Sequence, residues 1–333
     1  MEDSGPNGRG YHPGAMPPTL LLRLDAALLA GHHALDEVAG VEPVDRRDAL
    51  LALLAIHDLH TAPLDRLGDR VRWQHHPAVA ALKWRLEDGL LDWLHAEDAA
   101  VEWDLPDDPV AAMRALSARD LVPPVYDWLA DDADLDEVVD FLSLEGGPDG
   151  GFDDLVAACQ IGVAGEAKVE LAQNYWDEMG NGSLDAVHTE LHHRLVAALG
   201  MRAVPRHEQP VEALERAALG TVLATNRHLQ REMVGALGLI ELQAGPRCRR
   251  VVKALHRLDA PADAFPFYEE HAVADPRHGK DWLDHVVAPL AEDPAWAAGI
   301  VRGARWRSVV NRRFFGTLAL VFAAPAEAER RAS

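Results

Sequence analysis

The chain has 333 residues, and 48% of them are hydrophobic, which is enough to bury a sizeable core in one or two domains. Its formal net charge of -22 argues against binding to nucleic acid or to an anionic membrane, because both partners require a basic protein surface. Cys159 and Cys248 are the only cysteines, too few for a disulfide framework, and we expect both to stay reduced in a cytoplasmic protein.

Residues 1–18 are polar, rich in Gly and Pro and without an apolar signal core, so we expect a disordered tail there and a second one at residues 326–333. Between them, apolar residues recur at spacings of three and four, and strand signals are nearly absent, which predicts an all-α protein. Residues 19–108 are expected to form a helical extension packed on a larger bundle over residues 109–325. The helices predicted for that bundle cover residues 108–118, 134–145, 152–179, 184–199, 210–243, 246–257, 265–291 and 294–323.

The most informative motif is EHAVADPRH, in which His271, Asp275 and His278 are spaced by four and three residues. On a helical wheel Asp275 lies about 40° and His278 about 20° from His271, so all three side chains project from one stripe. Two imidazoles and one carboxylate that converge in this way suit a redox-active metal such as Fe(II). Pro276 interrupts the motif, and in the alternative interpretation it starts a new helix whose N-cap is Asp275.

Further acidic and imidazole side chains lie upstream of this motif. Glu178 and His188 flank the segment GNG, which breaks the helical periodicity and lets both flanking segments turn inward. Glu241 stands within the apolar run LGLIELQAG, where a buried carboxylate is costly unless it is paired or binds a metal. These residues are candidate partners of the histidine motif.

In this set of residues, and in the phrases EAKVELAQNYWDEMGNG and FYEEHAVADPRHGKDWL, the chain resembles the haem-oxygenase-like diiron oxidases and oxygenases, in the branch called iron-containing redox enzymes. The likeness covers about residues 136–290. It implies an all-α, haem-oxygenase-like helical bundle with the extension added at its N-terminal side. It also implies that two non-haem iron ions are held by six residues, Glu178, His188, Glu241, His271, Asp275 and His278. The chain lacks the two Glu-x-x-His pairs of ferritin-like bundles, which agrees with this arrangement.

The resemblance implies an O2-dependent oxidoreductase that oxidises a small organic molecule, such as an amine or a compound derived from an amino acid. Dioxygen and that molecule would be its substrates, and the family leaves room for an electron donor and for a homodimer. Some branches use a further carboxylate, for which Glu145 is our first candidate, with Asp153 and Asp154 as others. An amino-acid-derived substrate would need an arginine near the metals, and Arg227, Arg231 and Arg247 are unranked candidates.

Two alternatives belong to other functional classes. A thiaminase-like or cofactor-independent enzyme of the same fold would use a nucleophilic cysteine, for which Cys159 is the candidate. A non-catalytic helical interaction protein would use the same His and Glu side chains only for structure. Iron content separates both alternatives from a diiron enzyme.

Overall fold

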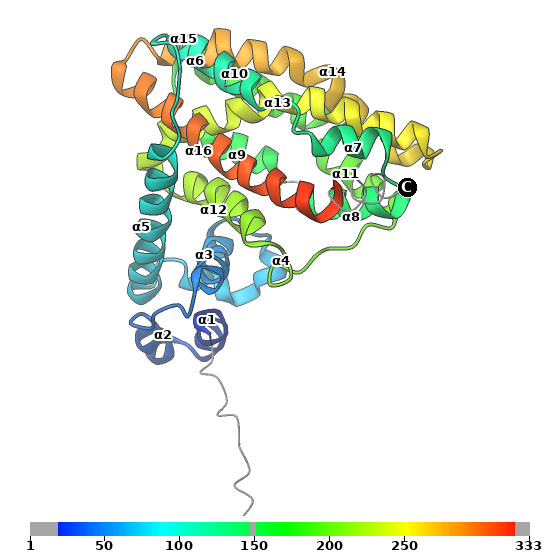
Figure 1. Cartoon of the computed structure of the whole chain (residues 1–333). Coiled ribbons are helices and arrows are strands. Elements are labelled where there is room, and N and C mark those ends of the chain that lie inside the picture. Colours follow the sequence, from blue (N-terminus) through cyan, green and yellow to red (C-terminus); the bar gives the residue numbers. More distant parts are fainter. Residues whose placement is uncertain (1–18, 147–150, 324–333) are drawn as a thin grey trace, which may run out of the picture.

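A computed structural model describes residues 19–146 and 151–323, and the predicted tails at 1–18 and 326–333 lie outside these ranges. The described residues form helices and no strand, as the periodicity predicts. The N-terminal part holds α1 (Leu20–Ala30), α2 (His32–Val38), α3 (Arg46–Thr61), α4 (Leu64–Leu67), the 3-10 turn η1 (Gly68–Trp73) and α5 (Pro77–Ala99). In Figure 1 these helices lie together at one end of the molecule, with α5 running up beside the larger bundle.

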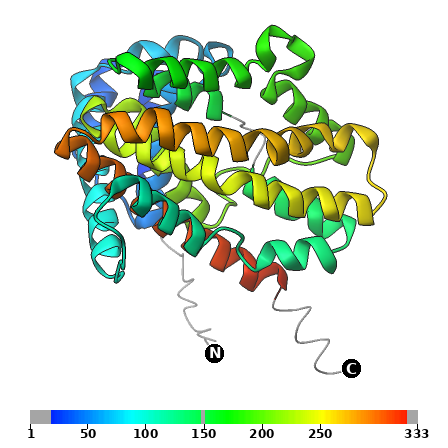
Figure 2. The same cartoon turned by 90° about the horizontal axis from the view of Figure 1, so that it is seen from above.

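The larger bundle is built from eleven further α-helices among the described residues: α6 (Pro109–Arg119), α7 (Val125–Asp131), α8 (Leu135–Glu145), α9 (Phe152–Cys159), α10 (Gly165–Glu178), α11 (His188–Leu199), α12 (Val211–Thr225), α13 (Gln230–Arg257), α14 (Pro266–Asp281), α15 (Ala288–Leu290) and α16 (Pro294–Leu318). Short 3-10 turns connect them at η2 (Gly180–Gly182), η3 (Leu184–Ala186), η4 (Arg227–Leu229) and η5 (Ala262–Ala264). Two wider π-type segments, η6 (Trp282–Val287) and η7 (Ala319–Ala323), extend α14 and α16. Helix α13 packs mainly on α14 and α16, and Figure 2 shows α13 and α14 side by side.

The predicted helix boundaries are wrong at three places, and α7 lies in a segment for which no helix is predicted. The helix predicted over residues 152–179 is interrupted between α9 and α10, where Gly162 and Gly165 have positive φ values that favour glycine. The break predicted near residue 245 is absent, because α13 runs through Pro246. A proline at position 246 cannot donate to the carbonyl of Leu242, and the Ser117 hydroxyl donates to that carbonyl instead, over 3.3 Å. The chain breaks earlier, at Asn226, between α12 and α13.

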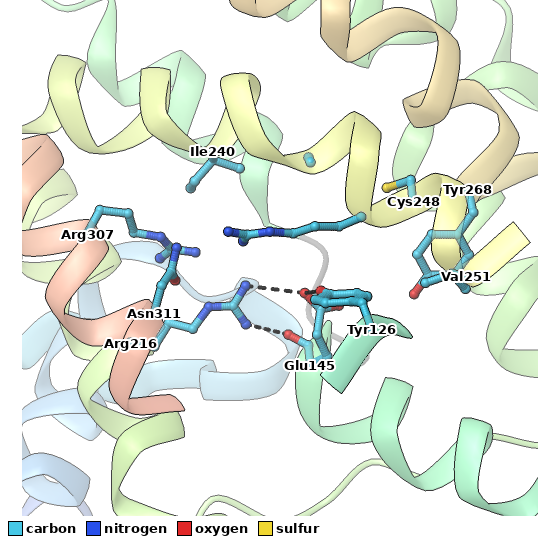
Figure 3. Close-up of a pocket in the computed structure, with 11 residues that line it drawn as sticks. Tyr126, Glu145, Arg216, Ile240, Cys248, Val251, Tyr268, Arg307 and Asn311 are labelled. Carbon is cyan, nitrogen blue, oxygen red and sulfur yellow. Dashed lines mark hydrogen bonds and ion pairs between the residues drawn. The ribbon is translucent and has the colours of Figure 1, made fainter. Parts of the chain in front are cut away.

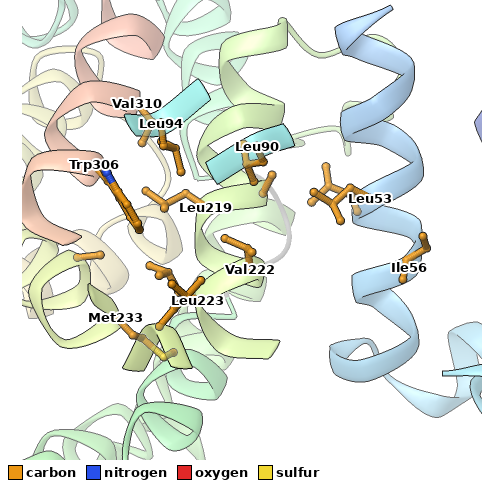
Figure 4. Packing of buried hydrophobic residues seen from close by; sticks show 14 of the residues in the cluster. Leu53, Ile56, Leu90, Leu94, Leu219, Val222, Leu223, Met233, Trp306 and Val310 are labelled. Atoms are coloured by element: carbon orange, nitrogen blue, oxygen red, sulfur yellow. The ribbon is translucent and has the colours of Figure 1, made fainter. Parts of the chain in front are cut away.

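The extension shares one continuous apolar core with the bundle. Leu53 and Ile56 of α3 and Leu90 of α5 are buried in the same cluster as Leu219 of α12 and Trp306 of α16. Figure 4 shows these side chains between the helices of the extension and those of the bundle. The contact therefore removes apolar surface from water on both sides, which is the main favourable contribution to such packing.

A buried polar network crosses the same boundary. The His57 ring of α3 lies 2.7 Å from Thr221 Oγ1 of α12 and 2.8 Å from Glu87 Oε1 of α5. Asn226, between α12 and α13, donates to the same Glu87 oxygen over 2.6 Å. Because a buried polar group without a partner costs free energy, these bonds tie the extension to one register on the bundle.

None of the helices in the described ranges is long and apolar enough to cross a bilayer.

Candidate metal centre

The turn after α10 brings Glu178 and His188 together. Gly180 and Gly182 have positive φ values, as does Asn181 between them, so the chain reverses at this point. A Cβ atom at position 180 would lie only 2.4 Å from the Ala186 carbonyl carbon, so only glycine permits this close approach. As a result Glu178, the last residue of α10, and His188, the first residue of α11, are both buried, with Glu178 Oε2 2.7 Å from His188 Nδ1.

The other candidate ligands lie on the antiparallel pair α13 and α14. Helix α14 is continuous from Pro266 to Asp281, so His271, Asp275 and His278 lie on one helix and Asp275 is not an N-cap. Pro276 cannot donate to the Ala272 carbonyl, and the Arg249 guanidinium of α13 donates to it over 3.1 Å. The helix therefore tolerates the proline, and the three side chains lie along one stripe of α14 as the spacing predicts.

Five of the six predicted ligands form two overlapping groups. Glu178, His188 and His271 present ligand atoms within 4.8 Å of one another, and so do Glu178, Glu241 and His278. Glu178 belongs to both groups. Asp275 is outside both, although it is buried at 3% exposure and its charge interacts with Glu241 and Glu178. A carboxylate shared by two groups is the arrangement that two neighbouring cations need.

Several polar atoms at this site are buried without a hydrogen-bond partner among the described residues. They are Nδ1 of His188, Nδ1 of His278 and Oδ2 of Asp275. His188 Nδ1 faces Glu178 and His278 Nδ1 lies 3.7 Å from Glu241 Oε2, but neither pair has hydrogen-bond geometry. Buried nitrogen and oxygen atoms that face one another without hydrogen bonds fit a metal cation and would otherwise be costly to bury.

The electrostatics of the site lead to the same conclusion. Burial, together with the Glu178 charge, raises the pKa of Glu241 to about 8, and burial with the Glu241 charge raises the pKa of Asp275 well above its usual value. Burial lowers the pKa of His271 to about 4. Burial opposes a charge on His188 too, but the adjacent Glu178 raises its pKa. Burial therefore favours the protonated form of both carboxylic acids, whereas a bound cation would favour the ionised form by direct charge interaction.

A family model described as iron-containing redox enzyme matches residues 140–311, just over half of the chain. The chain belongs to this family. The haem-oxygenase-like helical fold expected from the sequence is therefore confirmed, and membership of the family supports a redox enzyme at this coarse level. No curated protein shows significant sequence similarity to the chain.

In this iron-containing redox enzyme, two residues that position candidate ligands are not predicted from the sequence. Asn174, one turn before Glu178 on α10, donates its amide to Glu241 Oε1 over 2.9 Å. Asp177 Oδ2 lies 3.1 Å from His278 Nε2 and also pairs with Arg277. On α14 the Phe267 carbonyl accepts from His271 Nδ1 at 2.6 Å. Partners on the far side of a ligand hold its orientation and its tautomer, and Nδ1 of His278 and Nε2 of His271 are the nitrogens left available for a metal ion.

The extra carboxylate candidates have different surroundings. Glu145 Oε1 accepts from the Tyr126 hydroxyl over 3.1 Å and lies 3.5 Å from Arg216, so its carboxylate is already engaged away from the two ligand groups. Burial raises the pKa of Asp153, and the charges of Asp154 and Glu178 act in the same direction. Asp153 is therefore close enough to the shared carboxylate Glu178 to feel its charge.

Cys159 is unsuited to nucleophilic catalysis. Its side chain is fully buried, and burial raises the pKa of its thiol to about 12. A thiol needs to ionise to attack a substrate, and neither an adjacent base nor a lowered pKa activates this one. The thiaminase-like alternative therefore loses its proposed nucleophile.

Proposed function

We propose that the chain is a non-haem diiron oxidase or oxygenase that uses O2 to oxidise a small organic molecule. The observation that supports it best is the presence of Glu178 in both ligand groups, with His188 and His271 on one side and Glu241 and His278 on the other. Three carboxylates with three imidazoles form a hard, mixed ligand set that suits the Fe(II)/Fe(III) pair better than a structural zinc site, which is typically closed by four Cys or His ligands.

In this proposal, one iron is held by Glu178, His188 and His271, and the other by Glu178, Glu241 and His278. Asp275 is the sixth ligand, and its buried, unpartnered Oδ2 is the oxygen that would bind. When bound, the two irons supply the electrons and the open coordination positions that O2 activation requires.

The chain contributes orientation, exclusion of water and places for protons. Asn174 and Asp177 hold Glu241 and His278 from behind. Burial of the carboxylates keeps water from the reacting groups and strengthens every charge interaction among them. Glu241, whose pKa is raised to about 8, holds a proton at neutral pH until a cation displaces it. The partners in this proposal are dioxygen, one organic substrate and, where the reaction requires it, an electron donor.

Iron stoichiometry tests the shared carboxylate. Protein loaded with Fe(II) without air should bind about two irons per chain. Glu178→Ala should lose both irons, whereas His188→Ala and His278→Ala should each lose about one. His193→Ala is the matched control, because its side chain is 64% exposed on the same helix as His188. Wild-type protein without iron, or a Glu178→Ala variant with normal iron content, would contradict the proposal.

Rapid mixing tests the oxygen chemistry. The anaerobic, iron-loaded protein mixed with O2 should develop a transient visible absorption band, and the correct substrate should change the rate at which that band forms or decays. Slow, featureless oxidation that no amine, amino acid or other carboxylic acid alters would argue against an oxygenase.

A further inference from the structure

A cavity of about 80 Å³ lies inside the bundle, apart from the two ligand groups. Residues from α7, α8, α12, α13, α14 and α16 line it. In Figure 3 the side chains of Arg307 and Asn311 extend from α16 into the same space as Arg216 and Glu145. The cavity is smaller than the engineered cavity of about 150 Å³ that admits benzene, so it can hold one polar group of a substrate rather than a whole molecule.

The lining carries an excess of positive charge. Arg216, Arg247 and Arg307 contribute three guanidinium groups, and Glu145 contributes the one carboxylate among the lining residues. Buried charges are normally paired, because an unpaired charge in a low-dielectric interior is expensive. This lining therefore lacks an anion to balance it.

Arg307 is the least satisfied of the three. Its side chain is 8% exposed, and its Nε is buried without a hydrogen-bond partner among the described residues. Figure 3 draws no hydrogen bond or ion pair from Arg307 to another residue of the lining. Burial lowers the pKa of Arg307 well below its usual value, and the charges of Arg216 and Arg247 lower it further. Asn311, one turn along α16, also has a buried side-chain oxygen without a partner.

The other two guanidinium groups are fixed in place mainly by carbonyl oxygens. Arg247 donates to the backbone carbonyls of Asp120 and Leu121, over 2.8 and 3.0 Å. Arg216 donates to the Glu145 carbonyl over 2.5 Å and reaches its carboxylate only at 3.5 Å. Carbonyl partners orient a guanidinium group without cancelling its charge, so the cavity is prepared for an anion before one arrives.

The cavity lies next to the candidate metal centre along the same two helices. Cys248 lines the cavity and follows Glu241 by seven residues on α13, and Tyr268 lines it and precedes Asp275 by seven on α14. Seven residues are nearly two helical turns, so each pair shares a helix face about 10 Å apart along the axis. The Asp275 charge also acts on the Cys248 thiol, after burial the largest cause of its raised pKa.

We propose that this cavity binds the carboxylate of the substrate through Arg307, Arg216 and Arg247. A planar guanidinium matches a carboxylate with two parallel hydrogen bonds, and the small volume fits such a head group. The role in catalysis rests on the proposed function: a carboxylic acid anchored here would extend along α13 and α14, and its chain would have to span roughly 10 Å for a carbon distant from the carboxylate to reach the ligand groups. The anion site itself stands on the cavity alone.

Thermal unfolding of the iron-free full chain tests the anion site independently of iron. The probes are sodium propionate and propionamide, which have nearly the same shape but differ in charge, with sodium chloride at equal ionic strength as the reference. Propionate should raise the melting temperature in a concentration-dependent manner, and propionamide should raise it less. In Arg307→Met, the apparent affinity for propionate should fall roughly tenfold or more.

Arg312→Met is the matched control, since Arg312 lies on the same helix and its side chain is 42% exposed. This variant should keep the preference for propionate. Arg307→Met should also melt at a higher temperature than wild-type protein in the absence of probe, because the substitution removes an uncompensated buried charge. A residue that only supports the fold would give the opposite shift.

Equal stabilisation of wild-type protein by propionate and propionamide would overturn the anion site, whatever the variants do. A full preference for propionate in Arg307→Met, with a lowered melting temperature, would overturn it as well. Because iron is absent from this assay, failure here leaves the iron stoichiometry of the proposed function untouched. Conversely, failure to bind iron leaves the propionate result standing.

Discussion

Asp177 Oδ2 lies 3.1 Å from Nε2 of His278, although the two residues are 101 positions apart in the sequence. Asp177 directly precedes Glu178, so two consecutive carboxylates at the end of α10 have different roles in the site. Glu178 faces both ligand groups, and Asp177 stands behind one of the imidazoles. Burial opposes the charge of Asp177, but the His278 ring lowers its pKa, so it remains a charged acceptor.

We therefore expect Asp177→Asn to weaken iron binding roughly 10- to 100-fold while the helical content stays unchanged. The amide would leave the His278 ring free to rotate or to adopt the wrong tautomer. Iron titration followed by circular dichroism measures both quantities. Arg277→Gln is the comparison, because it removes one other partner of Asp177, a guanidinium that also lies 3.3 Å from His278 Nε2, but it leaves the contact between Asp177 and His278 in place. If the two variants bind iron equally, orientation by Asp177 is not needed.

The close approach of α13 and α14 depends on Gly245. A Cβ atom there would lie 2.9 Å from Pro276 Cδ, a rigid ring atom of the opposite helix. Gly245→Ala should lower the free energy of unfolding by about 1 to 3 kcal/mol, and it should also reduce the iron content, since α14 must move. Gly316→Ala, on the exposed side of α16 with no neighbour near the new Cβ, should stabilise the protein by about 0.5 to 1 kcal/mol. Chemical denaturation of both variants measures these changes. Stabilisation by Gly245→Ala together with destabilisation by Gly316→Ala would refute the packing argument.

Acidification should destabilise the extension through His60. Burial and the nearby Lys83 charge lower the pKa of His60 to about 4 in the folded protein, below the unfolded value of about 6.5. The folded state therefore binds fewer protons between these values, and stability is lost as the pH falls from 6.5 to 4. The loss due to this half-buried ring should be about 1 to 2 kcal/mol, less than full burial would give.

His60→Gln should remove that part of the pH dependence, whereas His33→Gln should not, because the His33 side chain is 92% exposed. Denaturant unfolding at pH 7, 5.5 and 4 provides the data. If the slope of stability against pH is unchanged in His60→Gln, groups other than His60 dominate the pH dependence of stability.

The thiols should be unreactive in the folded protein. Burial raises the pKa of Cys159 to about 12, and that of Cys248 also lies well above its usual value. A thiol-specific chromogenic reagent at pH 8 should therefore label neither residue until denaturant is added, after which both should react. Rapid labelling of Cys159 in the native state would reopen the thiaminase-like alternative.

Local patterns predicted most of the helices and the stripe of side chains on α14, because both depend on spacings of three, four or seven residues. The full set of six candidate ligands came from the family resemblance, and five of them converge in the structure. His271, Asp275 and His278 lie on one helix face, as their spacing predicts. The glycines on either side of Asn181 predict the turn after Glu178. The predicted break before Pro246 failed for a reason outside that pattern. Ser117 satisfies the carbonyl that the proline leaves free, and it comes from a helix more than a hundred residues earlier.

The same limit explains why the arginine cavity was missed. Arg247 is one of the three unranked candidates from the sequence, and nothing near Arg216 or Arg307 in the sequence distinguishes them from the other arginines. Of the unranked residues, Arg231 stacks over Trp296 and Arg227 approaches Gly162, away from the cavity lining. Only the packing of α12, α13 and α16 brings the three guanidinium groups together.

The polar network between the extension and the bundle also determines when the extension can complete its folding during synthesis. Thr221, which binds the buried His57 ring, follows it by 164 residues, and at about 5 to 20 residues per second it leaves the ribosome on the order of 10 to 30 s later. Until then His57 and Glu87 lack two of their partners, Thr221 and Asn226. We expect the first hundred residues to stay protease-sensitive during this interval. In stalled nascent chains that end before Thr221, a protease should cleave within these residues. In longer chains from which α13 and α16 have emerged, the same residues should be protected.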